Sequence, residues 1–296
     1  MKFIEHSAIK EKKGDLGTIA FSVNFLPLRN SRKKLTKISN SGMNFKKEPL
    51  ITVITVVYNG ERFLEKTILS VIDQSYQNFE YIVIDGGSTD QTLNIIQQYA
   101  GKIDYWVSES DSGISDAMNK GVVKAKGDYL VFIHADDYLL DKHSLAKASQ
   151  YFDDQHDVFA CAILYGKAFK ANLPRGLNLW TYFKTGIYHQ GVFCKRKVFE
   201  KVGLFDSEFN ISMDYDFFLR VYKAGIKAKT CPMFLTVMRE TGISSQRQNW
   251  ADVIKILGEE KRIHSKHCSS SLMKYIYQLY WFLYLPYKKF QFFIKS

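Results

Sequence analysis

The feature that most constrains the fold is a regular alternation of buried strands and helices between residues 51 and 133. The run Ile51–Val57 (ITVITVV) is a continuous β-branched stretch, which is typical of a strand buried on both faces of a parallel sheet. Apolar residues at helical spacing follow it, and further strands are predicted at Glu80–Asp85, Ile103–Val107 and Asp128–Ile133. This spacing predicts right-handed crossovers and an open, mostly parallel central sheet flanked by helices, which is the α/β class.

The pattern loosens in the second half of the chain. Strands are predicted at Val158–Gly166 and Thr230–Met238, and helices over Lys195–Val202 and Asp214–Ala224. We expect one α/β domain over residues 50–240, divided at residue 137. Residues 1–49 are expected to form a basic, partly disordered arm with a short strand near Thr18–Val23, and residues 241–296 a helical region.

The positive charge is concentrated at the two ends of the chain. The formal net charge is +11; residues 1–49 hold eleven Lys or Arg against four Asp or Glu, and residues 272–296 hold four Lys and no acid. The stretch between them is therefore formally neutral. A nucleic-acid-binding module carries its charge on the folded domain itself, so we expect no nucleic-acid partner. Charged ends favour an anionic membrane surface, although two solvated tails are the alternative.

The C-terminal segment Leu272–Ser296 is dominated by aromatic residues with Lys at its edges. Its longest uncharged stretch, Tyr275–Tyr287, has 13 residues, whereas a membrane-spanning helix needs about 20. Aromatic residues flanked by Lys suit the headgroup region. We expect an interfacial helix on a protein that is cytoplasmic and peripheral to the inner face of the cell membrane. A helix packed on the protein's own core or on a dimer partner is the alternative.

Polar side chains stand at the predicted carboxyl ends of successive strands: Tyr58 and Asn59, then Asp85, then Glu109 and Asp111, then Asp136 and Asp137. Ligands of open α/β sheets bind at this edge. Bare carboxylates repel an anionic sugar diphosphate, but Mg²⁺ or Mn²⁺ binds carboxylate and phosphate oxygens together. Asp136 and Asp137 are the natural metal residues on this argument. Asp85 is placed to accept hydrogen bonds from a nucleobase or ribose, and Tyr58 to stack on the base.

Three motifs, in order, resemble the family 2 inverting glycosyltransferases of the GT-A fold, in particular their bacterial polysaccharide-assembly branch. They are ITVITVVYN, SVIDQSYQNFEYIVIDGGSTDQT and SESDSGISDAMNKGVVKAKGDYLVFIHADD, and the resemblance covers about residues 50–240. It implies a nucleoside-diphosphate-sugar donor and a metal-binding D-x-D motif after the fourth strand. Here that motif reads His134-Ala135-Asp136, so Asp136 is the surer metal ligand, while His134 ligates the metal or bonds a phosphate.

The resemblance also assigns the remaining donor residues, with Asp85 at the base and Asp116 and Asn119 near the donor. The full donor-binding set is Thr55, Val57, Tyr58, Asn59, Asp85, Asp116, Asn119, His134, Ala135 and Asp136. Residues 50–137 thus become a donor-binding half and residues 138–240 an acceptor half.

The second half resembles the acceptor side of the same family. The family's general base is an aspartate that opens a helix, and Asp214 is the match. The acceptor-side set is Asp137, His189, Gln190 and Asp216. Asp214 and Asp216 lie two apart on a helix and face different ways, so only one is expected in the cleft. A helix-terminal charge is the alternative for Asp216, and a packed core histidine is the alternative for His189.

The predicted function is inverting transfer of a sugar, most simply from a UDP-sugar with Mn²⁺ or Mg²⁺, to a hydroxyl of a glycan or lipid-linked acceptor in cell-surface polysaccharide synthesis. A Rossmann-type nicotinamide or S-adenosylmethionine enzyme requires a glycine-rich turn after the first strand. The turn here, Tyr58–Arg62, contains one glycine. The departure at His134 leaves a second hypothesis, a catalytically impaired sugar-nucleotide-binding or membrane-scaffolding protein of the same fold.

Overall fold

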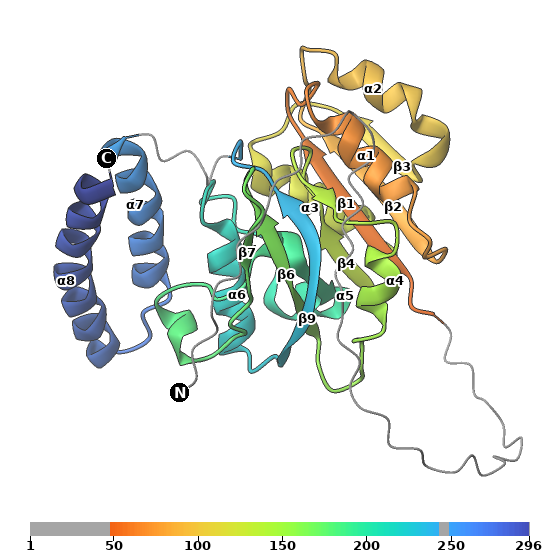
Figure 1. Cartoon of the computed structure of the whole chain (residues 1–296). Helices are drawn as coiled ribbons and strands as arrows, with labels where there is room; N and C mark the ends of the chain where they lie inside the picture. Colours follow the sequence, from red (N-terminus) through yellow and green to blue (C-terminus); the bar gives the residue numbers. More distant parts are fainter. Residues whose placement is uncertain (1–47, 243–248, 296) are drawn as a thin grey trace, which may run out of the picture. The chain divides into compact units, whose positions relative to one another are not determined.

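The computed structural model describes residues 48–242 and 249–295 (Figure 1), and these residues belong to one compact unit. Nearly all of the expected basic arm, including the strand near Thr18–Val23, lies outside the described residues. The first half contains β1 (Ile51–Val57), α1 (Leu64–Ile72), β2 (Phe79–Asp85), α2 (Thr92–Gln98), β3 (Tyr105–Ser108), α3 (Ile114–Lys124) and β4 (Tyr129–Phe132). The second half contains β5 (Tyr138–Leu139), α4 (Ser144–Ser149), β6 (Val158–Tyr165), β7 (Lys170–Asn172), β8 (Val192–Lys195), α5 (Arg196–Val202), α6 (Met213–Lys223), β9 (Ala228–Met238), α7 (Trp250–Lys266) and α8 (Ser271–Lys295).

One mixed sheet runs through both halves in the order β3-β2-β1-β4-β8-β6-β9-β5, with β7 paired to β6. The first four strands are parallel, as the alternating pattern predicts. Val57 pairs with Asp85, and Asp85 pairs with Ser108, so the carboxyl ends of β1, β2 and β3 lie level at one edge. β8 then joins β4 and β6 in antiparallel fashion, while β6 and β9 are parallel.

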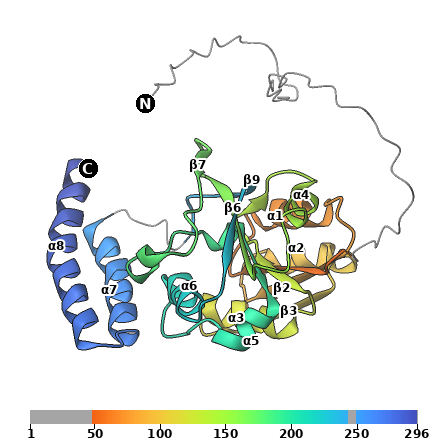
Figure 2. The same ribbon diagram turned by 90° about the horizontal axis from the view of Figure 1, so that it is seen from below.

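Helices cover both faces of this sheet (Figure 2). Helices α3, α5 and α6 enclose one hydrophobic core, and α1, α2 and α4 enclose the other. Side chains alternate along a strand, so Ile54 and Val56 of β1 enter the first core while Ile51 and Val53 enter the second. Burial on both faces explains why the strand reads as a continuous apolar run.

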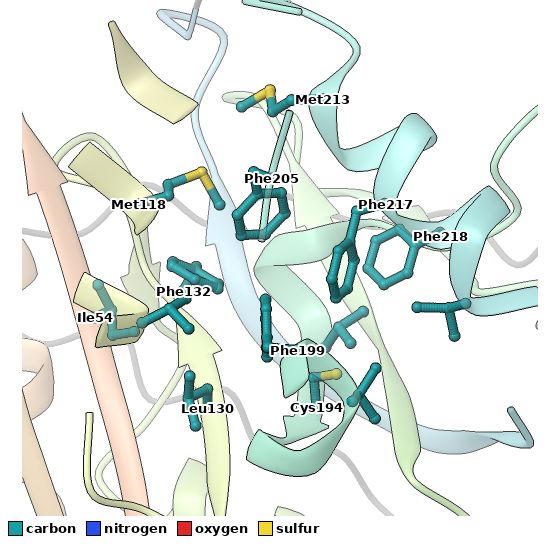
Figure 3. Packing of buried hydrophobic residues seen from close by; sticks show 14 of the residues in the cluster. Ile54, Met118, Leu130, Phe132, Cys194, Phe199, Phe205, Met213, Phe217 and Phe218 are labelled. Carbon is teal, nitrogen blue, oxygen red and sulfur yellow. The ribbon is translucent and has the colours of Figure 1, made fainter. Parts of the chain in front are cut away.

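An aromatic cluster joins the two halves (Figure 3). The Phe205 ring centroid lies 5.5 Å from that of Phe132 on β4 and 4.9 Å from that of Phe217 on α6. Asn119 of α3 clamps the backbone of Phe205, donating to its carbonyl at 2.8 Å and accepting from its N–H at 2.9 Å. Helix α6 therefore begins on a packed base tied to the first half.

The long elements agree with the sequence-based expectation, whereas the short strands β5, β7 and β8 and the helix α4 were not predicted. Each has six residues or fewer, too few for a hydrophobic period to show. The two C-terminal helices confirm the expected helical region. They pack on each other through Leu257, Tyr277 and Trp281. Within the described ranges, no helix combines the length and hydropathy that a membrane span requires.

Candidate active site

A cavity of about 750 Å³ opens at the carboxyl ends of β1 and β4, where the strand-end argument places a ligand. Cavities of this size hold cofactors and small substrates. Most residues of the predicted set line it: Val57, Tyr58, Asn59, His134, Ala135, Asp136, Asp137, His189, Gln190 and Asp214. The two halves of the sheet thus contribute to one cavity.

The turn after β1 is fixed by its neighbour, the turn after β2. The N–H of Asn59 donates to Ser88 Oγ at 2.7 Å, and Asn59 Oδ1 accepts from the Thr89 N–H at 2.9 Å. Asn59 has a φ of 50°, a left-handed conformation that Asn tolerates better than most residues. The turn leaves the Tyr58 ring 65% exposed at the cavity, where it can stack on a planar ligand.

The end of β4 carries two carboxylates in different environments. Asp136 Oδ2 accepts from Thr241 Oγ1 at 2.9 Å, and the Arg239 guanidinium bonds the Asp136 carbonyl. Asp137 is 1% exposed and accepts from the Arg239 N–H at 3.2 Å. Burial, followed by repulsion from Asp136, raises the pKa of Asp137 well above its ordinary value. Asp136 is the more accessible of the two to a cation, because the Asp137 side chain is buried whereas Asp136 is partly exposed.

His189 lies between the candidate base, Asp214, and His134, the residue at the first position of the D-x-D motif. Its Nδ1 lies 3.3 Å from Asp214 Oδ2, and its Nε2 lies 2.7 Å from His134 Nε2. An ionised carboxylate only accepts hydrogen bonds, so Nδ1 of His189 carries the proton facing Asp214. When the His189 ring carries only that proton, its Nε2 accepts from the Nε2–H of His134. Burial lowers the pKa of His134 well below its ordinary value, which keeps His134 neutral.

This arrangement leaves one nitrogen without a partner. His134 Nδ1 is buried and has no hydrogen-bond partner among the described residues. With Nε2 protonated, Nδ1 carries a free lone pair, so it suits a cation or a donor from a ligand.

The residues present fit a metal that arrives with a diphosphate better than a metal held by protein alone. Among the described residues, no group of three or more His, Cys, Asp and Glu side chains could hold a metal ion. The Asp136 carboxylate and the free His134 Nδ1 remain as donors. Mg²⁺ and similar ions commonly use one or two protein ligands and take the rest from phosphates and water.

Several predicted residues do not line the cavity. Asp85 is fully buried; it accepts from the Ser88 N–H at 3.1 Å, the Ser88 hydroxyl at 2.5 Å and the Ser108 hydroxyl at 2.6 Å. Thr55 is also buried, and its hydroxyl donates to the Ile133 carbonyl. In this structure Asp85 orders the turn after β2 and Thr55 ties β1 to β4, while their direct contacts with a donor stay a prediction.

The three other predicted residues outside the cavity lie on helices. Asp116 accepts from the Ser112 N–H at 3.1 Å near the start of α3, and Asn119 clamps Phe205. Asp216 is fully buried, with Arg220 Nε 2.9 Å from its Oδ2 and His267 Nε2 2.6 Å from its Oδ1. Asp216 therefore helps to hold α6, whereas Asp214 lines the cavity; an acceptor contact by Asp216 stays a prediction.

Some lining residues were not assigned from sequence. Asp111 lines the cavity beside Gly86, where an added Cβ would lie 2.4 Å from Asp111 Oδ2. Asn210, Ile211 and Thr241 also line it. Asp111 follows β3 and was already named among the strand-end residues, without a role in the site. Thr241 follows β9, so the same reading of strand ends would have found it. Asn210 and Ile211 lie in an irregular segment without a sequence signal.

Comparisons with known proteins identify the family of this chain. The model described as Glycosyl transferase family 2 matches residues 52–213. An uncharacterized glycosyltransferase of Mycobacterium tuberculosis is 30% identical over 226 residues, covering 74% of this chain and 84% of that protein. A PGL/p-HBAD biosynthesis glycosyltransferase of Mycobacterium bovis is 29% identical over 180 residues, covering 59% of this chain and 70% of that protein.

Solved structures share the fold at low sequence identity. The mannosyltransferase PcManGT of Pyrobaculum calidifontis, in complex with GDP-Man and Mn²⁺, aligns with a TM-score of 0.61 at 18% identity, covering 82% of this chain and 72% of that one. Residues 1–349 of Staphylococcus aureus TarS, in complex with UDP-GlcNAc, align with a TM-score of 0.57 at 17% identity, covering 73% of this chain and 70% of that one. The alignment with another structure of TarS 1–349 covers 64% of the TarS chain, and the alignment with a longer TarS chain covers 42% of it.

Proposed function

Because this chain is a member of glycosyl transferase family 2 and a glycosyltransferase, we propose that it transfers a sugar, with inversion, from a UDP-sugar to a hydroxyl of a glycan or lipid-linked acceptor. The observation that carries the proposal is one cavity lined by Tyr58, Asp136 and Asp214. An aromatic ring for a base, a carboxylate for a cation and a carboxylate for a proton are the three groups that such a transfer requires. The structures of TarS with UDP-GlcNAc and of PcManGT with GDP-Man and Mn²⁺ support a nucleotide-sugar donor.

In the proposed reaction Asp214 accepts the proton of the acceptor hydroxyl while that oxygen attacks the anomeric carbon. The bond from the anomeric carbon to the diphosphate oxygen breaks as the new bond forms, so the sugar configuration inverts. His189 holds the Asp214 carboxylate by its Nδ1–H and limits its rotation. Asp136 and His134 Nδ1 would hold Mn²⁺ or Mg²⁺. A bound divalent metal supplies positive charge to the leaving diphosphate.

The roles of the residues outside the cavity follow from their contacts. Asp85 and Thr55 support the donor side from beneath the turns, and Asp116 and Asn119 fix α3 and Phe205. We propose that residues 50–137 bind mainly the donor and residues 138–240 mainly the acceptor. Gln190 is placed on the acceptor side, as is Asp137, which stands at the boundary between the two halves. The PGL/p-HBAD glycosyltransferase relative supports a glycolipid or polysaccharide pathway.

The proposal is tested with purified protein, Mn²⁺ and a panel of UDP-, GDP- and dTDP-sugars, read by mass spectrometry. We expect nucleoside diphosphate release with one donor class. Asp136→Ala should abolish release, and Asp214→Asn should lower transfer by about 10²–10⁴-fold while UDP binding persists in calorimetry. Glu200→Ala, an exposed change on α5, is the matched control. Near-normal turnover in Asp214→Asn would remove Asp214 from the role of base.

The second candidate, a sugar-nucleotide-binding scaffold without turnover, is favoured only by the histidine at position 134. The same assay separates the two. Binding of a nucleotide sugar without any release, unchanged by the Asp214 substitution, would support the scaffold.

We also propose that α8 docks on an anionic membrane surface. One side of α8 packs on α7, whereas the other exposes large apolar side chains: Leu272, Tyr275, Leu279, Phe282, Leu283, Phe290 and Phe293 are each at least 60% exposed. Most are separated by three, four or seven residues, and Phe282 and Leu283 are adjacent, so all of them fall on one stripe of the helix. Lys274 and Lys289 are exposed on the same helix, and their charge matches anionic headgroups.

A further inference from the structure

Helix α7 lies beyond residues 52–213, the part matched by the family model, yet it contacts the segment that leads into the candidate base. In both views α7 lies beside α6 (Figures 1 and 2). We propose that Glu259 of α7 is a positioning residue for Asp214, so that the C-terminal helices form part of the catalytic unit. This inference rests on the proposed role of Asp214.

Glu259 accepts three consecutive backbone N–H groups. Its Oε1 lies 3.1 Å from the Asn210 nitrogen, and its Oε2 lies 2.9 Å and 2.8 Å from the nitrogens of Ile211 and Ser212. Glu259 is 8% exposed. The free N–H groups at the start of a helix need partners, and a carboxylate is favoured there by the helix dipole. Ser212 is the N-cap of α6 and has no side-chain capping bond. Glu259 therefore supplies the cap from another helix.

The capped segment belongs to the cavity wall. Asn210, Ile211, Met213 and Asp214 all line the cavity. The three N–H groups held by Glu259 belong to residues 210–212 and are separated from Asp214 only by Met213. The side chain of Asp214 bonds its neighbour's N–H and His189, so its position depends on where the first turn of α6 begins.

Two further side chains hold α6 after Asp214, one from α7 and one from His267, the residue that follows α7. His264 Nε2 lies 2.8 Å from the Tyr215 hydroxyl, and His267 Nε2 lies 2.6 Å from Asp216 Oδ1. Trp281 of α8 donates to the other nitrogen of His264 at 2.9 Å. Asp214 is thus bracketed by contacts to α7 on both sides along the chain. Among these contacts, Glu259 alone acts on the backbone that precedes the base.

The carboxylate is needed because three donors converge on it. In Glu259→Gln one oxygen becomes an NH₂ group that faces N–H donors, so at least one amide loses its acceptor. The start of α6 then shifts, and a misplacement of a catalytic group by about 1 Å costs about 10²-fold in rate.

The experiment compares Glu259→Gln with Glu260→Gln in the full chain. Glu260 neighbours Glu259 on α7 and pairs with Lys184 at 2.9 Å, so it matches the substitution without touching the capped segment. We expect Glu259→Gln to lower kcat by about 10–100-fold while donor KM and UDP affinity stay close to wild type, and Glu260→Gln to keep kcat. Glu259→Asp, which retains the charge, should recover part of the loss.

Hydrogen exchange separates this inference from the proposed function. The amides of residues 210–212 should exchange faster in Glu259→Gln than in wild type or Glu260→Gln, whether or not a donor is turned over. Unchanged exchange together with unchanged kcat would overturn the inference. An equal loss of kcat in Glu259→Gln and Glu260→Gln, in proportion to a fall in their melting temperatures, would also overturn the inference. If Glu259→Gln does not fold, Glu259→Asp gives the same comparison. If wild type shows no turnover with any donor, the proposed function fails while the exchange result still tests the contact.

Discussion

At the scale of single residues, the environment of each carboxylate decides what it can do. Asp136 and Asp214 line the cavity, whereas Asp85 and Asp216 are fully buried and engaged by other side chains. The sequence presents all four as aspartates at element ends. Three short contacts turn Asp85 into the anchor of the turn after β2, and that turn holds Asn59 in the cavity wall.

The anchoring role of Asp85 predicts a loss of stability on substitution. In Asp85→Asn, two donors meet an amide NH₂ group in place of a carboxylate oxygen, so we expect a loss of about 1–3 kcal/mol in the free energy of unfolding. Urea unfolding measures it. A cycle with Ser108→Ala should be non-additive, because both changes break the same bond. A UDP affinity that falls without any loss of stability would instead indicate direct contact with the donor.

The candidate site was predictable where position alone decides it. Tyr58, Asn59 and Asp136 follow buried strands, and the carboxyl edge of a parallel sheet brings such residues together. The position of a residue in the sequence does not reveal that the carboxylate oxygens of Asp85 and Asp216 already have hydrogen-bond partners. Those partners include Ser108 and His267, which are distant in sequence. The unpartnered nitrogen of His134 likewise appears only once His189 is placed against it.

At the scale of elements, α7 and α8 are joined to α6 through one buried histidine. His264 is 1% exposed, bonds the Tyr215 hydroxyl and Trp281, and stacks on Tyr277 with ring centroids 4.2 Å apart. Burial lowers its pKa from 6.5 to about 4. The unfolded chain binds a proton below about pH 6.5, whereas the native protein resists it down to about pH 4. The stability that neutral His264 contributes is therefore present above about pH 6.5 and is lost as the pH falls from 6.5 to about 4.

We therefore expect acid to weaken the protein less when His264 does not titrate. His264→Gln keeps hydrogen-bonding groups without a titrating ring, and the difference in unfolding free energy between pH 7.5 and pH 5 should shrink by about 2 kcal/mol relative to wild type. Urea unfolding at both pH values measures it. An identical pH dependence in wild type and variant would show that other groups carry the acid sensitivity.

Long elements were predictable because their hydrophobic period extends over two or more turns or a full buried strand. β8 has four residues and β5 has two, so their pairing depends on the sheet and not on their own sequence. These strands make the second half mixed, a feature that no local pattern indicates.

At the scale of the whole molecule, the exposed apolar stripe of α8 predicts that the protein binds membranes. Because these side chains are exposed, substitutions in the stripe should weaken that binding without unfolding the protein. The combination of Leu279→Glu, Phe282→Glu and Phe290→Glu should weaken binding to vesicles of anionic lipid by at least about tenfold, since each side chain forfeits apolar burial. Co-sedimentation at low and high salt measures this. Leu173→Glu with Val123→Glu, both exposed outside α8, is the control. If the triple variant binds vesicles as wild type does but is a smaller particle in light scattering, the stripe contacts a second copy of the chain and not the membrane.

The order of strands in the sheet has a consequence for biosynthesis. β4 is complete at residue 132, but its second neighbour, β8, begins at residue 192. While the intervening residues 133–191 leave the ribosome, the nascent sheet presents β4 as an open edge, the kind of surface that favours mispairing between chains. The carboxylate that caps α6 is translated later still, at residue 259, so the segment before Asp214 cannot reach its native bonding until α7 has been made.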